Sequence, residues 1–424
     1  MGFWMCTALV VGNIIGVSIF LLPASLAPYG FNALTGWLTT VAGCLVLACV
    51  FAALAKVFPE ADGPFSYIRE TLGEIPAFAA VWSYWVSCWC ANPVLATGTA
   101  AYLKVAIPAL EAVPSPVLAL AVLWLCVSVN LLGVRSGGRV QMVTTALKLA
   151  PMAAIVVLGL WVLASAPTSY VRHPPPTPIT LPLTMGAATL TLFAMLGLEC
   201  ATIPGRRVRD PARTMPRATI VGVVVSAAIY IAVSIIPMLL LPQAALARSS
   251  APFVDLMTPY VGVGVGRWLA LFVVISGLGA LNGWTLVVGE LTRTMGRSRI
   301  LPSVLGRTNR WGAPGAALVT TGALASALVA MNYSRTLVEA FTFLINVVTA
   351  ANLPLYLLCS ASLAVLGSER RAGWLVFGLA GVAYCVFVFI GVGWTSFQWA
   401  LVLMLAGLPV LALQRLGPLR RRAG

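Results

Sequence analysis

Long apolar stretches follow one another along almost the whole chain. On the criterion that a membrane-spanning α-helix needs about 20 mostly apolar residues, we count about twelve of them. They are centred near residues 15, 45, 90, 124, 152, 194, 230, 278, 323, 351, 382 and 405. Because 60% of the 424 residues are hydrophobic and only 9% are charged, little sequence is left for a water-soluble domain. The stretches therefore predict an all-α integral membrane protein with about twelve transmembrane helices.

Basic residues gather in every second connection between these stretches. They are Lys56, Arg69, Arg135, Arg139, Arg206, Arg207, Arg209, Arg213, Arg217, Arg293, Arg297, Arg299, Arg307, Arg310, Arg370 and Arg371, followed by Arg415, Arg420, Arg421 and Arg422 in the tail. Lysine and arginine are enriched in the cytoplasmic loops of membrane proteins, so we expect both termini to be cytoplasmic. The net charge of +15 then indicates topology and contact with anionic membrane lipid, and we expect no nucleic-acid partner.

The first span is interrupted by polar and flexible residues between Gly12 and Pro23. Asn13 and Ser18 lie there with two glycines, where a membrane helix is normally apolar throughout. Glycine favours non-helical backbone, and non-helical backbone inside a membrane is tolerated where it lines a cavity. We therefore expect helix 1 to break here and to line a binding site.

The sixth span contains a carboxylate, Glu199, two residues after Gly197. An acidic side chain within a membrane span is a functional candidate, although hydrogen bonds within the helix bundle could also neutralise it. The glycine predicts a second break, in helix 6. Breaks in helices 1 and 6, on opposite sides of the proline-rich segment 174–178, are typical of an inverted repeat of five plus five helices.

This repeat gives the expected domain boundaries. They are residues 1–165 for the first repeat, 166–182 for an external linker, 183–366 for the second repeat, and 367–424 for the last two helices and the basic tail.

Several other spans carry polar or aromatic residues. The third span holds Tyr84 among tryptophans and also Asn92, which precedes Pro93; its amide is the better site candidate, since packing alone could explain the aromatic residues. Trp284 in the eighth span could stack on a ligand or could equally be a core residue. The tenth span contains Asn346, Thr349, Asn352 and Pro354, and we expect these polar groups to face the interior of the bundle.

Lys148 in the fifth span has two interpretations. Its side chain could extend to the membrane surface, or it could be a buried ammonium that acts as a fixed cation or carries a proton.

Seven segments of the sequence together form a recognisable pattern. They run from Gly12 to Phe20, Gly63 to Gly73, Tyr84 to Asn92, Gly197 to Glu199, Ser250 to Asp255, Gly283 to Thr285 and from Leu301 onward. In these segments the chain resembles the basic amino acid and polyamine antiporter family, which includes arginine/agmatine antiporters. This family is part of the amino acid, polyamine and organocation superfamily. The resemblance implies the LeuT-type fold, a homodimer in the bacterial inner membrane, and amino acid transport by alternating access without ATP.

The resemblance also implies roles for individual residues. The substrate carboxylate would meet the first break around Gly16, Val17 and Ser18, and the amino group would meet the second at Phe193, Met195, Leu196 and Gly197. Asn13, in the first break, is a further substrate-binding candidate. The substrate side chain would meet Asn92 and stack on Trp284. Gating or proton coupling would involve Tyr84, Trp284, Lys148 and Glu199.

The chain departs from the arginine/agmatine antiporters at some of these positions. Their Gly-Ser-Gly sequence at the first break is Gly16-Val17-Ser18 here, their sixth-helix tryptophan is Phe193, and a pocket methionine is Leu95. Lys148 instead resembles the fifth-helix lysine of proton-coupled and heteromeric transporters in the superfamily. It implies independence from sodium and leaves proton coupling open.

These features favour a secondary transporter that exchanges cationic amino acids and amines such as arginine and agmatine. The alternative is a proton-coupled symporter of small neutral amino acids. A channel is disfavoured because we find no continuous row of polar residues. An enzyme is disfavoured because the chain has one histidine, His173, in a predicted loop. We expect no metal or cofactor, and we expect the cysteines to pack as small apolar residues.

Overall fold

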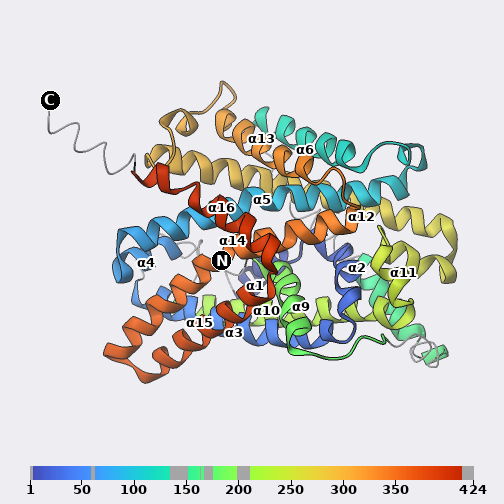
Figure 1. Cartoon of the computed structure of the whole chain (residues 1–424), viewed down its shortest axis with the longest axis horizontal. Coiled ribbons are helices and arrows are strands. Elements are labelled where there is room, and N and C mark those ends of the chain that lie inside the picture. The colour runs from blue at the N-terminus through green and yellow to red at the C-terminus, as the bar shows by residue number, and fades with distance from the viewer. Residues whose placement is uncertain are drawn as a thin grey trace.

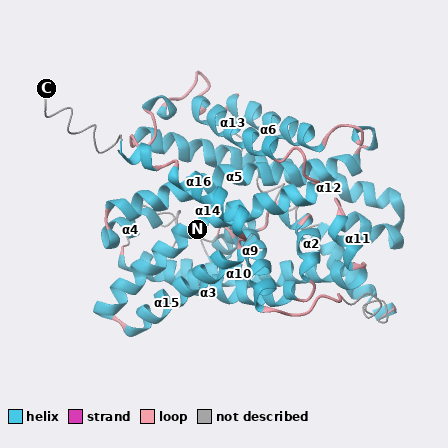
Figure 2. Cartoon of the chain, in the orientation of Figure 1, coloured by secondary structure: helices cyan, strands magenta, loops and turns pink. Residues whose placement is uncertain are grey.

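The computed structural model describes residues 3–58, 63–133, 151–162, 164–166, 175–197 and 211–412. Every regular element in these ranges is helical (Figure 2). The labelled elements are α1 (Phe3–Ile14), η1 (Val17–Phe20), α2 (Leu22–Leu26), η2 (Ala27–Tyr29), α3 (Asn32–Val57), α4 (Pro64–Leu72), α5 (Glu74–Ala106), η3 (Pro108–Leu110), α6 (Ser115–Leu131), α9 (Leu181–Met195), α10 (Pro211–Leu240), α11 (Gln243–Arg248), α12 (Pro252–Arg297), η6 (Ser303–Gly306), α13 (Gly315–Met331), α14 (Leu337–Arg370), α15 (Ala372–Gly391) and α16 (Trp394–Leu405). The all-helical structure of these ranges agrees with the predicted all-α class.

Six of the described helices are long and apolar enough to cross a membrane. They are Asn32–Val57, Arg217–Leu240, Pro252–Arg297, Leu337–Ser368, Ala372–Gly391 and Trp394–Ala412. Four shorter apolar helices accompany them, at Ser115–Leu131, Pro151–Val162, Leu181–Met195 and Gly315–Met331. The protein is therefore a multi-pass membrane protein by the length and composition of its helices.

The long helices run in roughly the same direction across the molecule, and α14 lies at its centre (Figure 1). Helix α5 packs against α12 and α14, α14 packs against α15, α3 packs against α9, and α1 packs against α10. Segments far apart in the sequence thus meet around α14 and the short elements that follow α1.

Small residues allow some of these helices to approach closely. A Cβ atom added at Gly36 of α3 would lie only 2.7 Å from the Cβ of Ala187 on α9. Gly378 of α15 packs equally tightly against the backbone of Ala364 on α14. In a membrane, where lipid is as apolar as a side chain, such close packing is a main source of helix association.

Three irregularities interrupt the described helices. Helix α1 ends at Ile14 and η1 begins at Val17, within the predicted break, and α9 ends at Met195, beside the second. The sequence analysis did not anticipate the kink in α12 at Gly262, whose φ is 82°. Helix α5 continues through Pro93.

Candidate functional site

The break in helix 1 is held in place by Tyr230 of α10. The hydroxyl of Tyr230 donates a hydrogen bond to the carbonyl of Ile14 (2.8 Å) and accepts one from the amide of Gly16 (3.2 Å). Both backbone groups lie where the helical ladder stops, so they would otherwise lack a partner. Tyr230 is fully buried and its ring lies 5.5 Å from that of Trp37. The break is therefore a fixed feature of the fold.

A cavity of about 60 Å³ lies beside this break. Five parts of the chain line it: the break itself, α5, α9 with the residue that follows it, α12 and α14. The lining residues are Ile14, Gly16, Ser18, Tyr84, Ser87, Cys88, Ala91, Leu95, Phe193, Ala194, Leu196, Trp284, Val348 and Asn352. None of these described residues carries a charged side chain. The wall combines apolar groups, aromatic rings, hydroxyls and one amide, a composition that suits a small ligand.

Six of the expected site residues line this cavity. They are Gly16, Ser18, Tyr84, Phe193, Leu196 and Trp284. They come from four separate segments, so the fold brings together positions that lie up to 268 residues apart.

The other expected site residues fall outside the wall or outside the described part of the chain. Asn92 is 1% exposed and Met195 is fully buried, and neither lines the cavity. The Oδ1 atom of Asn92 has no hydrogen-bond partner among the described residues. Gly197 follows the end of α9 with φ at 103°. Lys148, Glu199 and the side chains of Asn13 and Val17 lie outside the described residues.

The sequence analysis did not assign Ser87 and Asn352 to the site. Ser87 Oγ lies 3.1 Å from Asn352 Oδ1 and 2.9 Å from the carbonyl oxygen of Tyr84, so the pair joins α5 to α14. Asn352 and Thr349 are buried in the bundle, as expected for the polar groups of the tenth span. The polar residues of the tenth span were the feature of the sequence that could have indicated a site on this helix. They did not indicate which of the polar groups reaches the cavity.

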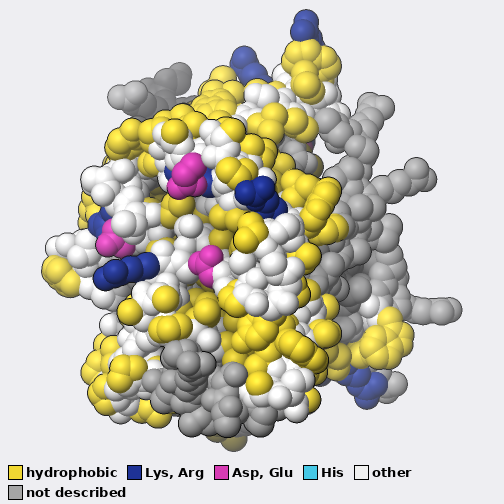
Figure 3. Space-filling model, turned by 90° about the vertical axis from the view of Figure 1, so that its right-hand side faces the viewer, with side chains coloured by type: hydrophobic (Ala, Val, Ile, Leu, Met, Phe, Trp, Pro, Cys, Tyr) yellow, Lys and Arg dark blue, Asp and Glu magenta, His cyan; other side chains and the backbone are white. Residues whose placement is uncertain are grey.

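A second, much larger cavity opens at one end of the molecule; we call it the vestibule. Its volume is about 1230 Å³, and it is bordered by the ends of α5, α11 and η2 and the start of α14. Acidic and basic side chains surround the hollow on this face (Figure 3). The charged residues that line it are Lys104, Glu111, Arg248, Arg335 and Glu339.

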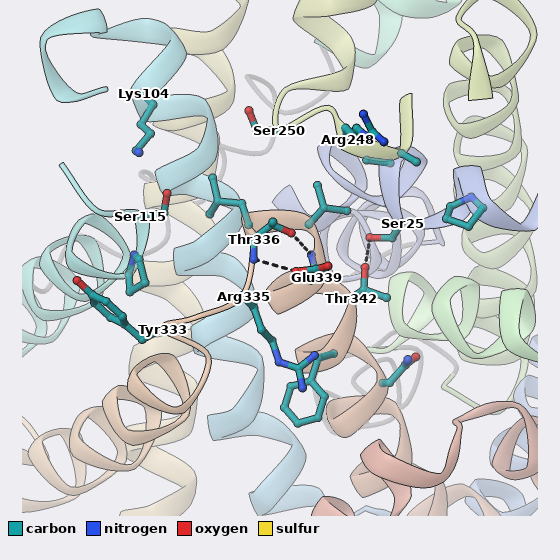
Figure 4. Close-up of a pocket in the computed structure, with 18 of the residues that line it drawn as sticks. Ser25, Lys104, Ser115, Arg248, Ser250, Tyr333, Arg335, Thr336, Glu339 and Thr342 are labelled. Carbon is teal, nitrogen blue, oxygen red and sulfur yellow. Dashed lines mark hydrogen bonds between the residues drawn. The ribbon is translucent and has the colours of Figure 1, made fainter. Parts of the chain in front are cut away.

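The start of α14 forms part of the vestibule wall (Figure 4). Thr336 and Glu339 form a capping box, in which each side chain bonds the backbone of the other residue. The guanidinium of Arg335 lies 4.6 Å from the centroid of the Phe343 ring. One turn into the helix, the Thr342 and Ser25 hydroxyls hydrogen-bond at 2.7 Å, which joins α14 to α2.

Helix α14 connects the vestibule with the smaller cavity. Thr342 and Asn346 line the vestibule, and Val348 and Asn352 line the cavity. Helix α12 starts just after Ser250 at the vestibule, contributes Trp284 to the cavity and ends at Arg297 in a basic connection. The cavity therefore lies between the vestibule and the basic end of the molecule.

Comparison with known proteins gives this arrangement a context. The family model described as amino acid permease matches residues 1–415 of the chain. The chain belongs to the amino acid permease family. Members of this family are transporters and not enzymes, and membership implies small-molecule amino acid or amine substrates.

Similar permeases are antiporters and transporters of amino acids and polyamines. A protein of Bacillus subtilis (strain 168), named as a proposed arginine/ornithine antiporter, is 32% identical over 429 residues, covering 92% of this chain and 91% of that protein. The putrescine transporter PotE of Escherichia coli (strain K12) is 28% identical, covering 86% of this chain and 83% of its own. The cadaverine/lysine antiporter of the same strain is 28% identical, covering 77% of this chain and 74% of its own.

Proposed function

We propose that this permease exchanges cationic amino acids and their amines across the bacterial inner membrane, with arginine and agmatine as the first candidates. The observation that carries the proposal is the cavity lined by the helix-1 break and Trp284. The relatives support it, because their names specify arginine, ornithine, putrescine, cadaverine and lysine.

In this proposal the two helix ends hold the head group of the amino acid. The backbone around Gly16, Val17 and Ser18, where η1 begins, attracts the carboxylate, since the amino-terminal end of a helix carries partial positive charge. The carbonyl groups at the end of α9, at Phe193, Met195, Leu196 and Gly197, accept from the amino group. Asn13, in the helix-1 break, is a further candidate for contact with the substrate.

The substrate side chain then lies between Trp284 and α5. The indole face attracts a cation, and Tyr84 is a further aromatic residue of the cavity wall. The unpartnered Oδ1 of Asn92, buried close by in α5, becomes available to the substrate when the helices move.

The proposal extends to the whole transport cycle. Twelve helices in a LeuT-type inverted repeat, with boundaries after residues 165, 182 and 366, alternate access to the cavity in a homodimer. The vestibule is the extracellular entrance, and both termini are cytoplasmic with the basic connections. Closure of Trp284 over the side chain precedes opening of the opposite side.

Reconstitution tests the exchange activity. Proteoliposomes loaded with unlabelled arginine should take up radiolabelled arginine or agmatine, and empty proteoliposomes should take up far less. Equal loading with leucine is the matched control. Uptake of alanine or leucine without any exchange of arginine or agmatine would contradict the proposal.

A second candidate is proton-coupled symport of small neutral amino acids. The absence of charged side chains among the described lining residues favours it. It predicts uptake into empty proteoliposomes that is driven by an imposed proton gradient, whereas exchange requires internal substrate.

Glu199 and Lys148 are our candidates for proton coupling. If Glu199 titrates during transport, Glu199→Gln should flatten the dependence of the transport rate on pH, because glutamine cannot bind the proton. Lys148→Ala should slow transport and leave expression intact. Transport rates measured from pH 5 to 8 check both, and unchanged profiles and rates would assign both residues to structure.

A further inference from the structure

Asn352 is the only amide side chain in the wall of the cavity formed by the described residues. It is 2% exposed, and its Nδ2 atom has no hydrogen-bond partner among those residues. A buried amide nitrogen without a partner costs free energy, so such a group in a binding cavity indicates that a ligand or a rearrangement supplies the missing bond.

The neighbouring hydroxyl defines which rearrangement is available. Ser87 Oγ is within hydrogen-bond distance of two acceptors, the carbonyl of Tyr84 and Oδ1 of Asn352. A hydroxyl has one hydrogen to donate but two lone pairs that accept. Both bonds are satisfied together if Ser87 donates to Tyr84 and accepts from the Asn352 amide nitrogen. A 180° rotation of the amide group produces this arrangement, and it directs Oδ1 away from Ser87.

We propose that Asn352, held by Ser87, presents its amide oxygen to the cationic end of the substrate side chain and so determines the preference for cations over neutral side chains. This inference rests on the proposed exchange function. An ammonium or guanidinium group offers only donors, so it matches a free amide oxygen and cannot bond a free amide nitrogen. An aliphatic side chain has neither a hydrogen-bond donor nor an acceptor, so it leaves the Asn352 amide incompletely bonded.

The test compares ligands that differ at the end of the side chain. Ornithine and norleucine are isosteric, but ornithine ends in an ammonium group and norleucine ends in a methyl group. Ornithine, norleucine and unlabelled arginine are each tested as a competitor. Each competes with radiolabelled arginine for binding to the purified full-length protein. The quantity of interest is the ratio of cation affinity to norleucine affinity.

Asn352→Leu should lower this ratio by about 10- to 100-fold, because it removes a hydrogen bond to a charged group from a site of similar size. Ser87→Ala should lower it by about 3- to 10-fold through loss of amide orientation. Asn352→Asp keeps an oxygen acceptor and should keep the ratio at or above that of the wild type. Ser360→Ala is the matched control for Ser87→Ala, since it removes a buried, unpartnered hydroxyl from α14 outside the cavity wall.

The outcomes separate the inference from the proposed function. If wild-type protein binds neither arginine, agmatine nor ornithine, the proposed function is wrong. If it binds them and Asn352→Leu leaves the ratio unchanged, only the inference is overturned. A ratio for Asn352→Asp as low as that for Asn352→Leu would also overturn it. Should Asn352→Leu fail to fold, an unchanged ratio in Ser87→Ala decides against the inference.

Discussion

A single hydroxyl group, that of Tyr230, bonds both backbone groups at the break in helix 1. The chain places this tyrosine more than 200 residues after the break, in α10. Glycine near Ile14 allows the helix to stop, but Tyr230 gives the interrupted backbone one defined geometry. The backbone that we propose for carboxylate binding is thus held in position from a different helix.

Tyr230→Phe should therefore destabilise the protein and reduce transport. It removes two hydrogen bonds to backbone groups, each with a cost of about 1 to 3 kcal/mol if the remaining partner stays buried. Thermal unfolding in detergent should show a lower midpoint than that of the wild type. Tyr260→Phe, which removes an exposed hydroxyl from α12, is the control; equal midpoints for the two variants would show that these bonds do not hold the break.

At the scale of elements, the sequence indicated the helices and several of their interruptions. Apolar stretches near 45, 230 and 351 correspond to α3, α10 and α14, because helix formation in a membrane depends on local composition. The glycines and polar residues between Gly12 and Pro23 likewise located the break between Ile14 and Val17. The kink at Gly262 was not predicted, since glycine is also common in uninterrupted membrane helices.

The pairing of Ser87 with Asn352 shows what element-level reasoning missed. The polar residues of the tenth span indicated that one face of α14 lies inside the bundle. The contact joins residues 265 positions apart, however, and depends on how α14 is rotated against α5. The rotation of α14 about its axis is decided by packing with several neighbours, such as the close approach of α15 at Gly378. The sequence of α14 alone therefore does not predict this rotation.

At the scale of the whole molecule, the vestibule and the basic connections lie at opposite ends of α12. The vestibule is open in this conformation, and the cavity lies deeper, between it and the basic end. An alternating-access transporter needs a second conformation in which the basic end opens instead.

Labelling from one side of the membrane should identify the two ends. Glu111→Cys introduces a thiol in the exposed vestibule wall, and Arg310→Cys introduces one in an exposed basic connection. In intact cells, a membrane-impermeant maleimide should label the first variant, and should label the second only after permeabilisation. Labelling of the wild-type protein gives the background from native cysteines. The reverse labelling pattern of the two variants would show that the predicted orientation is wrong.

The sequence by itself determined the membrane environment, the helical class, the break in helix 1 and the resemblance to antiporters of basic amino acids and polyamines. Each of these depends on composition or on short motifs that act locally. The tertiary structure decided which polar groups share a cavity, which hydroxyl holds the break, and that Asn352 reaches the cavity wall while Asn92 does not line it. The physical reason is that a helix surface points in every direction, and only packing against its neighbours selects the face that meets the ligand.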